Sequence, residues 1–215
     1  TNMARKVAES NGVTCYDTFT GFKFMAEKKG ELESSGQGEV IMSYEESYGY
    51  MLGDYVRDKD AVTASLLLTE MAAWYQSQGM TLFDALQALY EKYGYYGEKT
   101  HNLVMPGLDG LEKMAALMKN LRDVPPTEIA GVAVTARTDY KDGTITDCTT
   151  GQVTASELKG SNVLRYTLAD GTVILVRPSG TEPKIKVYIL TLGKDAEERD
   201  TNIEKYSQWA LALQN

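Results

Sequence analysis

Histidine and cysteine are almost absent from this 215-residue chain, which excludes several kinds of catalytic and metal site. His101 is the only histidine, so neither a histidine-based catalytic triad nor a site with several histidine ligands can be built. The only cysteines, Cys15 and Cys148, lie far apart in the sequence and form no CxxC pair. We therefore expect reduced thiols and a cytoplasmic protein, and we interpret His101 as a surface loop residue.

Long apolar runs and an excess of basic residues are also missing. No stretch approaches the ~20 apolar residues that span a bilayer, and the N-terminus lacks the apolar segment of a secretory signal. With 30 acidic and 22 basic residues the formal charge is -8, so a phosphate polymer would meet net repulsion. We expect no membrane and no nucleic acid as partners. Position 1 is threonine rather than an initiator methionine, which is compatible with a start inside a longer chain.

The beginning of the chain reads as helix, turn and strand. A helix is predicted over residues 3–8, closed by Asn11-Gly12 as a left-handed cap, and the run VTCYDTF predicts a strand. TGFKF is predicted as a loop, and VIMSY as a buried strand that leads into the loop EESYGY. Because strands that alternate with helices imply parallel crossovers, this part predicts an incomplete α/β layer.

Two helices follow this layer. Apolar residues recur at helical spacing from Asp58, which can cap the first helix, to Gly79, which ends it. The second helix opens with Thr81 and Asp84, which resemble a capping box, and stops at Gly94. The first domain is therefore predicted to end near residue 95.

The rest of the chain predicts a small α+β unit. No periodicity is visible over residues 95–106, and a helix begins at about Asp109. Four strands follow, and a last helix covers roughly residues 195–213; the strands are GVAVTARTDY, NVLRYTL, TVILVR and KIKVYIL. Short connections such as Ala169-Asp170-Gly171 favour antiparallel pairing. The predicted domains are residues 1–95 and 96–215.

The loop RPSGTEPK joins two apolar strands and has the composition of an anion site. Arg177 can offer a two-pronged hydrogen bond to phosphate, and Ser179 and Thr181 add hydroxyl donors. Gly180 lets backbone N–H groups approach an anion closely. The alternative is an ordinary hairpin turn, since Ser, Gly and Pro are common turn residues.

Two further segments carry polar groups that suit a sugar phosphate. In EESYGY, Glu45 and Ser47 are natural partners for sugar hydroxyls, although an acidic, solvated turn is the alternative. Glycosidase chemistry is disfavoured because the adjacent Glu45 and Glu46 tend to point apart. Arg57 and Lys59 precede the first long helix, where they either attract an anion or are ordinary surface charges.

Taken together and in this order, TGFKF, EESYGY, RDKDAV and RPSGTEPKIK resemble the C-terminal half of the phosphoglucomutase/phosphomannomutase family, in particular its long bacterial phosphoglucomutases. The resemblance covers nearly the whole chain. It implies the end of the family's third domain, a partial three-layer α/β domain, followed by its fourth. The fourth domain is a small antiparallel sheet with helices on one face, similar to the TATA-box-binding protein.

The resemblance assigns roles in sugar binding to five residues of the first domain. Glu45 and Ser47 correspond to residues that bind the sugar hydroxyls, and Thr20, Gly21 and Phe22 to the loop that distinguishes the two orientations of the substrate. The chain departs from many relatives by an extra residue after the binding serine and by a tyrosine before the binding glutamate. The preferred sugar among glucose, mannose and pentose phosphates therefore stays open.

The resemblance also assigns a phosphate site and a proton-transfer residue. Arg177, Ser179, Gly180 and Thr181 correspond to the loop that holds the phosphate that is not transferred. Lys59 resembles a lysine proposed as general acid or base in some members, a role that requires its neighbours or burial to lower its pKa.

The implied parent enzyme interconverts sugar 1-phosphates and 6-phosphates, glucose being favoured, through a phosphoserine and a bisphosphate intermediate. It would use Mg²⁺, with glucose 1,6-bisphosphate as activator, and the phosphorylated sugar and the N-terminal domains of the parent chain would be the partners. The sequence contains neither the family's serine loop nor a D-x-D-x-D metal loop. We therefore expect this chain to bind without turnover; the alternative is a stand-alone, non-catalytic sugar-phosphate-binding module.

Overall fold

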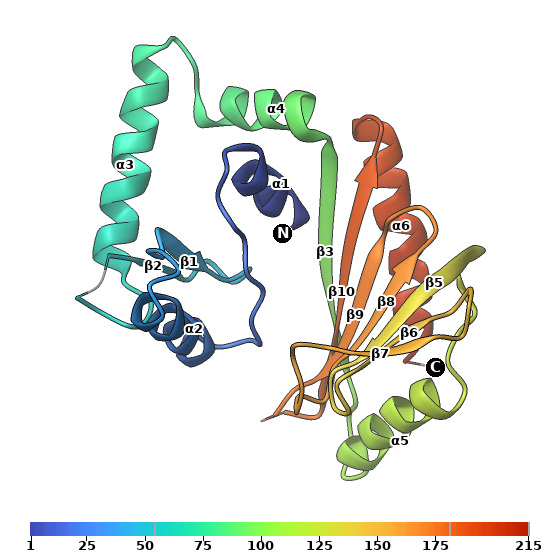
Figure 1. Ribbon diagram of the computed structural model, residues 1–215. Helices are drawn as coiled ribbons and strands as arrows, with labels where there is room; N and C mark the ends of the chain where they lie inside the picture. Colours follow the sequence, from blue (N-terminus) through green and yellow to red (C-terminus); the bar gives the residue numbers. More distant parts are fainter. Residues whose placement is uncertain (54, 181, 215) are drawn as a thin grey trace. The chain divides into compact units, whose positions relative to one another are not determined.

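The computed structural model describes residues 1–53, 55–180 and 182–214. The chain divides into two compact units, one of Arg5–Lys92 and one of Thr1–Ala4 with Tyr93–Asn215. The first combines helices with a short hairpin, and the second combines a large antiparallel sheet with two helices (Figure 1). This mixed α/β and α+β architecture confirms the predicted fold class.

The first segment differs from the prediction after its opening helix. Helix α1, Asn2–Ser10, is confirmed, and Gly12 at φ 72° provides the left-handed turn that follows it. The run VTCYDTF is a largely exposed loop, and no strand among the described residues pairs with it, so the strand prediction was wrong. TGFKF is not wholly a loop, because helix α2 begins at Phe22 and continues to Ser34. The many Lys and Glu side chains of this helix, and Gly30 within it, leave no clear helical spacing of apolar residues in the sequence, so the helix was not predicted.

The two strands of this unit form a hairpin. Strand β1, Met42–Tyr44, pairs antiparallel with β2, Tyr50–Leu52. The predicted strand VIMSY exists in part, but Ile41 is 69% exposed and Met42 40%, so the prediction that it is buried was wrong. Because a short loop joins β1 to β2, only antiparallel pairing is sterically open to them. The parallel crossovers expected here are absent from the described residues.

Helices α3, Ala61–Ser77, and α4, Leu82–Tyr93, are confirmed with one correction. The N-cap of α3 is Asp60, not Asp58, because the Asp60 carboxylate accepts hydrogen bonds from the first free N–H groups of the helix. The capping box of α4 is confirmed: Thr81 N donates to Asp84 Oδ2 at 2.8 Å, and Asp84 N donates to Thr81 Oγ1 at 3.1 Å.

The apolar side chains of α3 are exposed in the described structure. Val62, Leu66 and Trp74 are each more than half exposed, and α3 contains no buried residue. The helix contacts β2, and the Asp60 cap organises its first turn. Apolar periodicity correctly predicted this helix but not the burial of its apolar side chains.

The second unit is built on one antiparallel sheet with strand order β3-β10-β9-β8-β5-β6-β7, and β4 pairs with β5. Strands β5, β8, β9 and β10 confirm the four predicted strands, whereas β3, β4, β6 and β7 were missed. The bounds are β3 Tyr95–Val104, β4 Glu128–Ile129, β5 Val132–Asp139, β6 Thr144–Asp147, β7 Val153–Ala155, β8 Leu164–Leu168, β9 Val173–Pro178 and β10 Lys184–Gly193. Helices α5, Gly110–Asp123, and α6, Ala196–Ala212, agree with the predicted positions.

Strand β3 occupies the segment in which no regular structure was predicted. It pairs with β10 along its whole length, so main-chain hydrogen bonds compensate for its polar sequence. His101 lies in this strand rather than in a surface loop, and its Nε2 is 2.8 Å from Ser207 Oγ on α6. Partial burial lowers the pKa of His101. The surface interpretation of His101 was therefore wrong.

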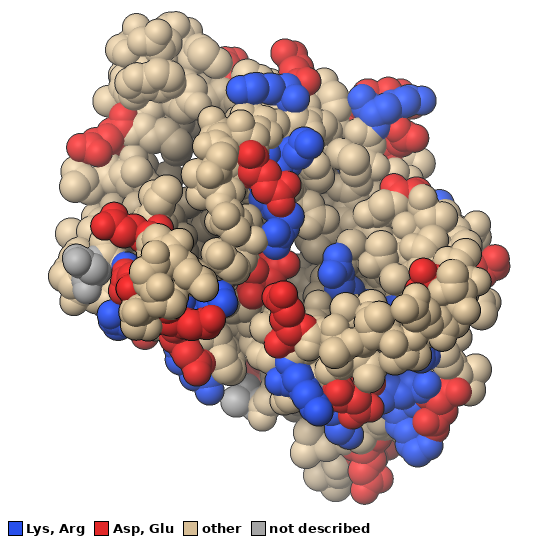
Figure 2. Space-filling model, in the orientation of Figure 1, with Lys and Arg blue, Asp and Glu red and all other residues tan. Residues whose placement is uncertain are grey.

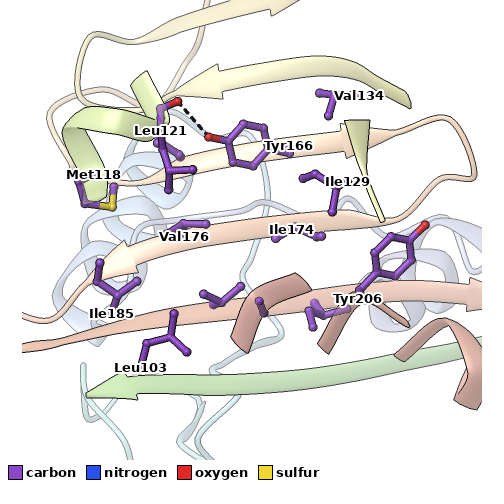
Figure 3. Packing of buried hydrophobic residues seen from close by; sticks show 14 of the residues in the cluster. Leu103, Met118, Leu121, Ile129, Val134, Tyr166, Ile174, Val176, Ile185 and Tyr206 are labelled. Atoms are coloured by element: carbon purple, nitrogen blue, oxygen red, sulfur yellow. Dashed lines mark hydrogen bonds between the residues drawn. The ribbon is translucent and has the colours of Figure 1, made fainter. Parts of the chain in front are cut away.

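The core lies between α5, α6 and one face of the sheet (Figure 3). The strand residues on this face are fully buried, including Ile174, Val176 and Ile185. Tyr166 OH reaches across to donate to the carbonyl of Leu121 on α5 at 3.3 Å, which satisfies the hydroxyl inside the core (Figure 3). The strand register places the alternate residues on the opposite face; they include Arg165, Leu175, Arg177, Lys186 and Tyr188.

No helix in the described part of the chain is both long and apolar enough to cross a membrane.

Candidate functional site

The predicted phosphate loop is the turn between β9 and β10. Ser179 N donates to Lys184 O at 2.8 Å, which closes the hairpin, and Met105 N donates to Pro183 O at 2.8 Å, which ties the loop to the end of β3. The two ends of the loop, at Ser179 and Pro183, are thus each held by a main-chain hydrogen bond. Such preorganisation lowers the entropic cost of binding. Thr181, one of the predicted phosphate ligands, lies outside the described residues.

Two glycines near this loop have opposite surroundings. A Cβ on Gly110, the first residue of α5, would lie 2.2 Å from the Met105 carbonyl oxygen and 3.0 Å from Pro183 Cβ, so close packing requires glycine there. A Cβ on Gly180 would meet no atom of the chain within 4 Å. Packing among the described residues therefore gives no reason for glycine at position 180.

Arg177 lies in a locally basic part of the sheet. It pairs across the strands with Lys186, and Arg165 lies on the same face. Arg177 Nη1 donates to Tyr188 Oη at 3.4 Å. Lys184 forms an ion pair with Glu182, whose pKa is lowered by the hydrogen bond from Lys184 and by its charge. The face displayed in Figure 2 mixes acidic and basic side chains and presents no single broad basic field.

The second predicted cluster lies in the first unit, around Gly49. A Cβ on Gly49 would lie 2.8 Å from each of three side chains: Glu45 Oε1, Lys59 Cδ and Phe22 Cε2. These residues come from three segments, the start of α2, the β1–β2 loop and the approach to α3. The structure therefore brings together three of the residues to which the resemblance assigned roles. Gly49 was missed as a site residue; its position within a glutamate-containing loop was the available signal.

The loop EESYGY is a hairpin connection and not the edge of a parallel sheet, which corrects the predicted setting. Glu45 N donates to Gly49 O at 3.0 Å, so the loop closes on itself. Ser47 is exposed, and Tyr48 adopts a left-handed conformation with φ 66° while 87% of it is exposed. The polar groups of Glu45 and Ser47 are thus carried by a tight turn with one strained residue.

The predicted orientation loop divides into exposed and buried parts. Thr20 is exposed, and Gly21 is the N-cap of α2 at φ 123°. Phe22 is only 3% exposed. Phe22 is therefore a buried residue of the unit, and Thr20 is the exposed residue of this segment.

Lys59 lies above the Phe22 ring, with Nζ 4.9 Å from the ring centroid, in a cation–π contact. Its ammonium is 3.0 Å from Asp58 Oδ1, and hydrogen bonds from Lys59 lower the pKa of Asp58. The Lys59 side chain is 54% exposed. Burial, one of the two ways in which a lysine can become a general acid or base, is therefore absent at Lys59.

Asp60, directly after Lys59, caps the start of α3. Its carboxylate makes the stability of the unit depend on pH. Its carboxylate accepts hydrogen bonds from Tyr55 OH and from the Thr63 hydroxyl and amide, which hold the pKa of Asp60 far below its usual range. A lowered native pKa means that this contribution to stability is present above about pH 4 and is lost as the pH falls toward the native pKa.

We expect Asp60→Asn to reduce the loss of stability between about pH 5 and pH 2, because asparagine also caps helices but does not titrate. Thermal melting followed by circular dichroism, compared at each pH with the unaltered chain, measures the difference. The same pH dependence in both proteins would contradict this role.

The described residues offer no metal site: no three His, Cys, Asp or Glu side chains among them are grouped as ligands. They therefore do not fit Mg²⁺, and no step of the chemistry is assigned to a metal within them.

Comparison with known proteins agrees with both halves of this description. Residues 1–93 match the family described as phosphoglucomutase/phosphomannomutase, alpha/beta/alpha domain III, and residues 102–199 match the phosphoglucomutase/phosphomannomutase C-terminal domain. The chain is 36% identical over 190 residues to a phosphoglucomutase of Staphylococcus aureus, covering 87% of this chain and 33% of the relative. It is 35% identical over 206 residues to a phosphoglucomutase of Staphylococcus haemolyticus, covering 96% of this chain and 36% of the relative.

The fold is similar to that of a solved structure, the open form of the exocytosis-sensitive phosphoprotein parafusin (phosphoglucomutase) from Paramecium. The TM-score is 0.62 at 20% identity, over 97% of this chain and 35% of that one. This chain thus spans about a third of the length of the relatives that it matches. By its sequence over both units, the chain belongs to the phosphoglucomutase/phosphomannomutase family.

Proposed function

We propose that this chain is the sugar-binding and phosphate-binding part of a phosphohexomutase that interconverts sugar 1-phosphates and 6-phosphates, with glucose as the first candidate sugar. The convergence of Glu45, Lys59 and Phe22 on Gly49 carries this proposal. Three segments that are separate in the sequence bring a carboxylate, the stem of a lysine and an aromatic ring to one place. A carboxylate binds vicinal hydroxyls, and an ammonium attracts a phosphate oxygen.

Each described group has a defined task in this proposal. Glu45 and Ser47 accept and donate hydrogen bonds to the sugar hydroxyls, and Thr20 contacts the sugar from the start of α2. Arg177 and Ser179, with the backbone beside Gly180, hold the phosphate that is not transferred. Fixing the substrate in this way supplies orientation and charge stabilisation, which are the main contributions that proteins make to phosphoryl transfer.

Lys59 is proposed to contact the substrate as a cation. Its ion pair with Asp58 and its contact with Phe22 hold the ammonium, and its Cδ lies beside Gly49, which Glu45 Oε1 also approaches. Its proposed role as general acid or base has no support from burial, since 54% of the side chain is exposed.

The parent enzyme is proposed to supply the reacting groups from domains outside this sequence. These are a phosphoserine, an acidic loop that holds Mg²⁺, and the remaining walls of the site, with glucose 1,6-bisphosphate as activator. Mg²⁺ would neutralise charge on the phosphoryl group in transfer. The 215-residue chain is accordingly proposed to bind without turnover, and the enzyme to act in the cytoplasm, where its unpaired Cys15 and Cys148 would stay reduced.

A titration followed by amide NMR tests the proposal. We expect glucose 1-phosphate and glucose 1,6-bisphosphate to shift the amide signals of Ser179, Gly180, Glu45 and Ser47. Glucose should leave the amide signals of Ser179 and Gly180, in the β9–β10 turn, unchanged. Inorganic phosphate should shift the signals of these two residues and not those of Glu45 and Ser47. No shift at millimolar phosphosugar would overturn the proposal for this chain. An assay with Mg²⁺ and both sugars should show no conversion to glucose 6-phosphate.

A further inference from the structure

Helix α2 contains a buried lysine, Lys29. A glutamate of the same helix balances its charge. Lys29 is 4% exposed and forms an ion pair with Glu33, one turn further along α2. A lysine at this depth is rare unless it is paired, because desolvation of a single charge is costly. Glu33 therefore has one fixed partner inside the unit.

Glu33 has a second partner in the loop that carries Lys59. Its Oε2 is 3.5 Å from Nη2 of Arg57, so one carboxylate bridges the buried ammonium and the loop guanidinium. Gly30 lies beside this bridge. A Cβ at position 30 would be 3.1 Å from Arg57 Nη1, closer than most such contacts, so the missing side chain makes room for the guanidinium.

The same helix contacts Lys59 through its first residue. The Phe22 ring lies beneath Lys59 Nζ, while Gly30 and Glu33 receive Arg57 two residues earlier in the loop. On its other side the loop is held where Asp60 N donates to Tyr50 O at 2.9 Å. The short segment from Arg57 to Lys59 is thus attached to α2 at both ends.

We propose that Glu33 is a positioning residue: by bridging Lys29 and Arg57 it holds the Arg57–Lys59 segment against α2 and thereby keeps the Lys59 side chain over the Phe22 ring and beside Gly49, which Glu45 also approaches. The inference rests on the proposed function, since it concerns the same sugar-phosphate site. Glu33 and Arg57 are proposed to act indirectly. Their effect passes through the position of Lys59.

The Gly30→Ala variant tests positioning without removing a charge. Alanine is the better helix former by about 1 kcal/mol, so we expect the melting temperature to stay the same or to rise. Because the new methyl group would lie 3.1 Å from Arg57 Nη1, the guanidinium must shift, and the ε-methylene protons of Lys59 should lose their upfield shift from the Phe22 ring. The affinity for glucose 1-phosphate should fall about threefold to fivefold, as expected when one partly exposed ion pair is lost.

The chain contains an internal reference for this measurement. Lys23 Nζ lies 4.7 Å from the Phe24 ring centroid on the same helix and has no contact with Arg57 among the described interactions. Its ring-current shift should be unchanged in Gly30→Ala. A change at both lysines would show that the variant distorts α2 and would count against a specific effect.

Variants of Glu33 test the bridge itself. Glu33→Gln alone leaves Lys29 buried without its counter-charge and destabilises the unit, so Lys29→Met is combined with it. Replacing a buried ion pair by groups of similar size is often neutral for stability, and we expect the double variant to fold but to lose the Lys59 ring-current shift. Glu31→Gln is the matched control, because Glu31 pairs with Lys28 on the same helix and should leave Lys59 unchanged.

The outcomes separate this inference from the proposed function. A Lys59 ring-current shift that survives in both Gly30→Ala and the double variant would overturn the positioning role, whatever the affinity. If the variants lose the Lys59 ring-current shift but the unaltered chain does not bind phosphosugars, the positioning role is supported and the proposed function is rejected. Loss of both shift and affinity in the variants, at unchanged stability, supports both.

Discussion

Replacing Ile189 by alanine is expected to lower the free energy of unfolding of the C-terminal unit by about 2–5 kcal/mol. Ile189 lies in β10, is fully buried, and pairs with Ile174 of β9 on one side and Lys99 of β3 on the other. Truncation removes apolar surface from the core and leaves a cavity between the sheet and its helices. The close packing of neighbouring strands prevents the gap from closing.

The two tryptophans allow this loss to be measured in one unit. Trp209 packs against the core of the C-terminal unit, whereas Trp74 lies on α3 in the other. In a Trp74→Phe background, tryptophan fluorescence during urea unfolding reports Trp209 alone. Val153→Ala, at a site that is 58% exposed on β7, is the control and should cost less than about 0.5 kcal/mol. A loss at Ile189 no larger than at Val153 would contradict the described core.

Arg177→Ala is expected to weaken phosphosugar binding by about 1.5–3 kcal/mol, roughly tenfold to 150-fold in Kd. Arg177 is the last residue but one of β9, next to the hairpin loop, and shares its sheet face with Lys186. Its guanidinium can meet two phosphate oxygens at once, which a lysine cannot reproduce. Arg177→Lys should therefore retain the charge and recover only part of the affinity.

Calorimetric titration with glucose 1-phosphate, at low and at moderate salt, measures both variants. Arg165→Ala is the control: it removes the same charge from the same sheet face, but from β8 and outside the loop. If only the general field of this face matters, the two alanine variants will weaken binding equally, and salt will reduce the weakening in both. Affinity that is unchanged in Arg177→Ala, in a chain that binds measurably, would remove Arg177 from the site.

The elements that local chemistry specifies were predicted well. The capping box of Thr81 and Asp84, the glycine stop at Gly79 and the four apolar strands all depend on neighbours in the sequence. The edge strand β3 was missed because its polar sequence gains order from β10, which lies some ninety residues later. Pairing at such a distance leaves no local pattern to detect.

The candidate site was predicted unevenly for the same reason. Motif resemblance named Glu45, Lys59 and Phe22, but not that Gly49 is the point where they meet. The local sequence also could not decide between Asp58 and Asp60 as the helix cap. Both are aspartates, which cap helices well, and they lie only two positions apart. The hydrogen bonds to Asp60 settle it.

Sequence alone predicted a mixed α/β protein, because turn, cap and strand signals act over a few neighbouring residues, and its four loop motifs carried the resemblance to the phosphoglucomutase/phosphomannomutase family. Tertiary structure decided which face of each strand is buried, that β1 and β2 form a hairpin, and that Glu33 bridges a buried Lys29 to Arg57. These are contacts between distant segments. Their energy depends on desolvation and on distances in space, which the spacing of residues along a chain does not contain.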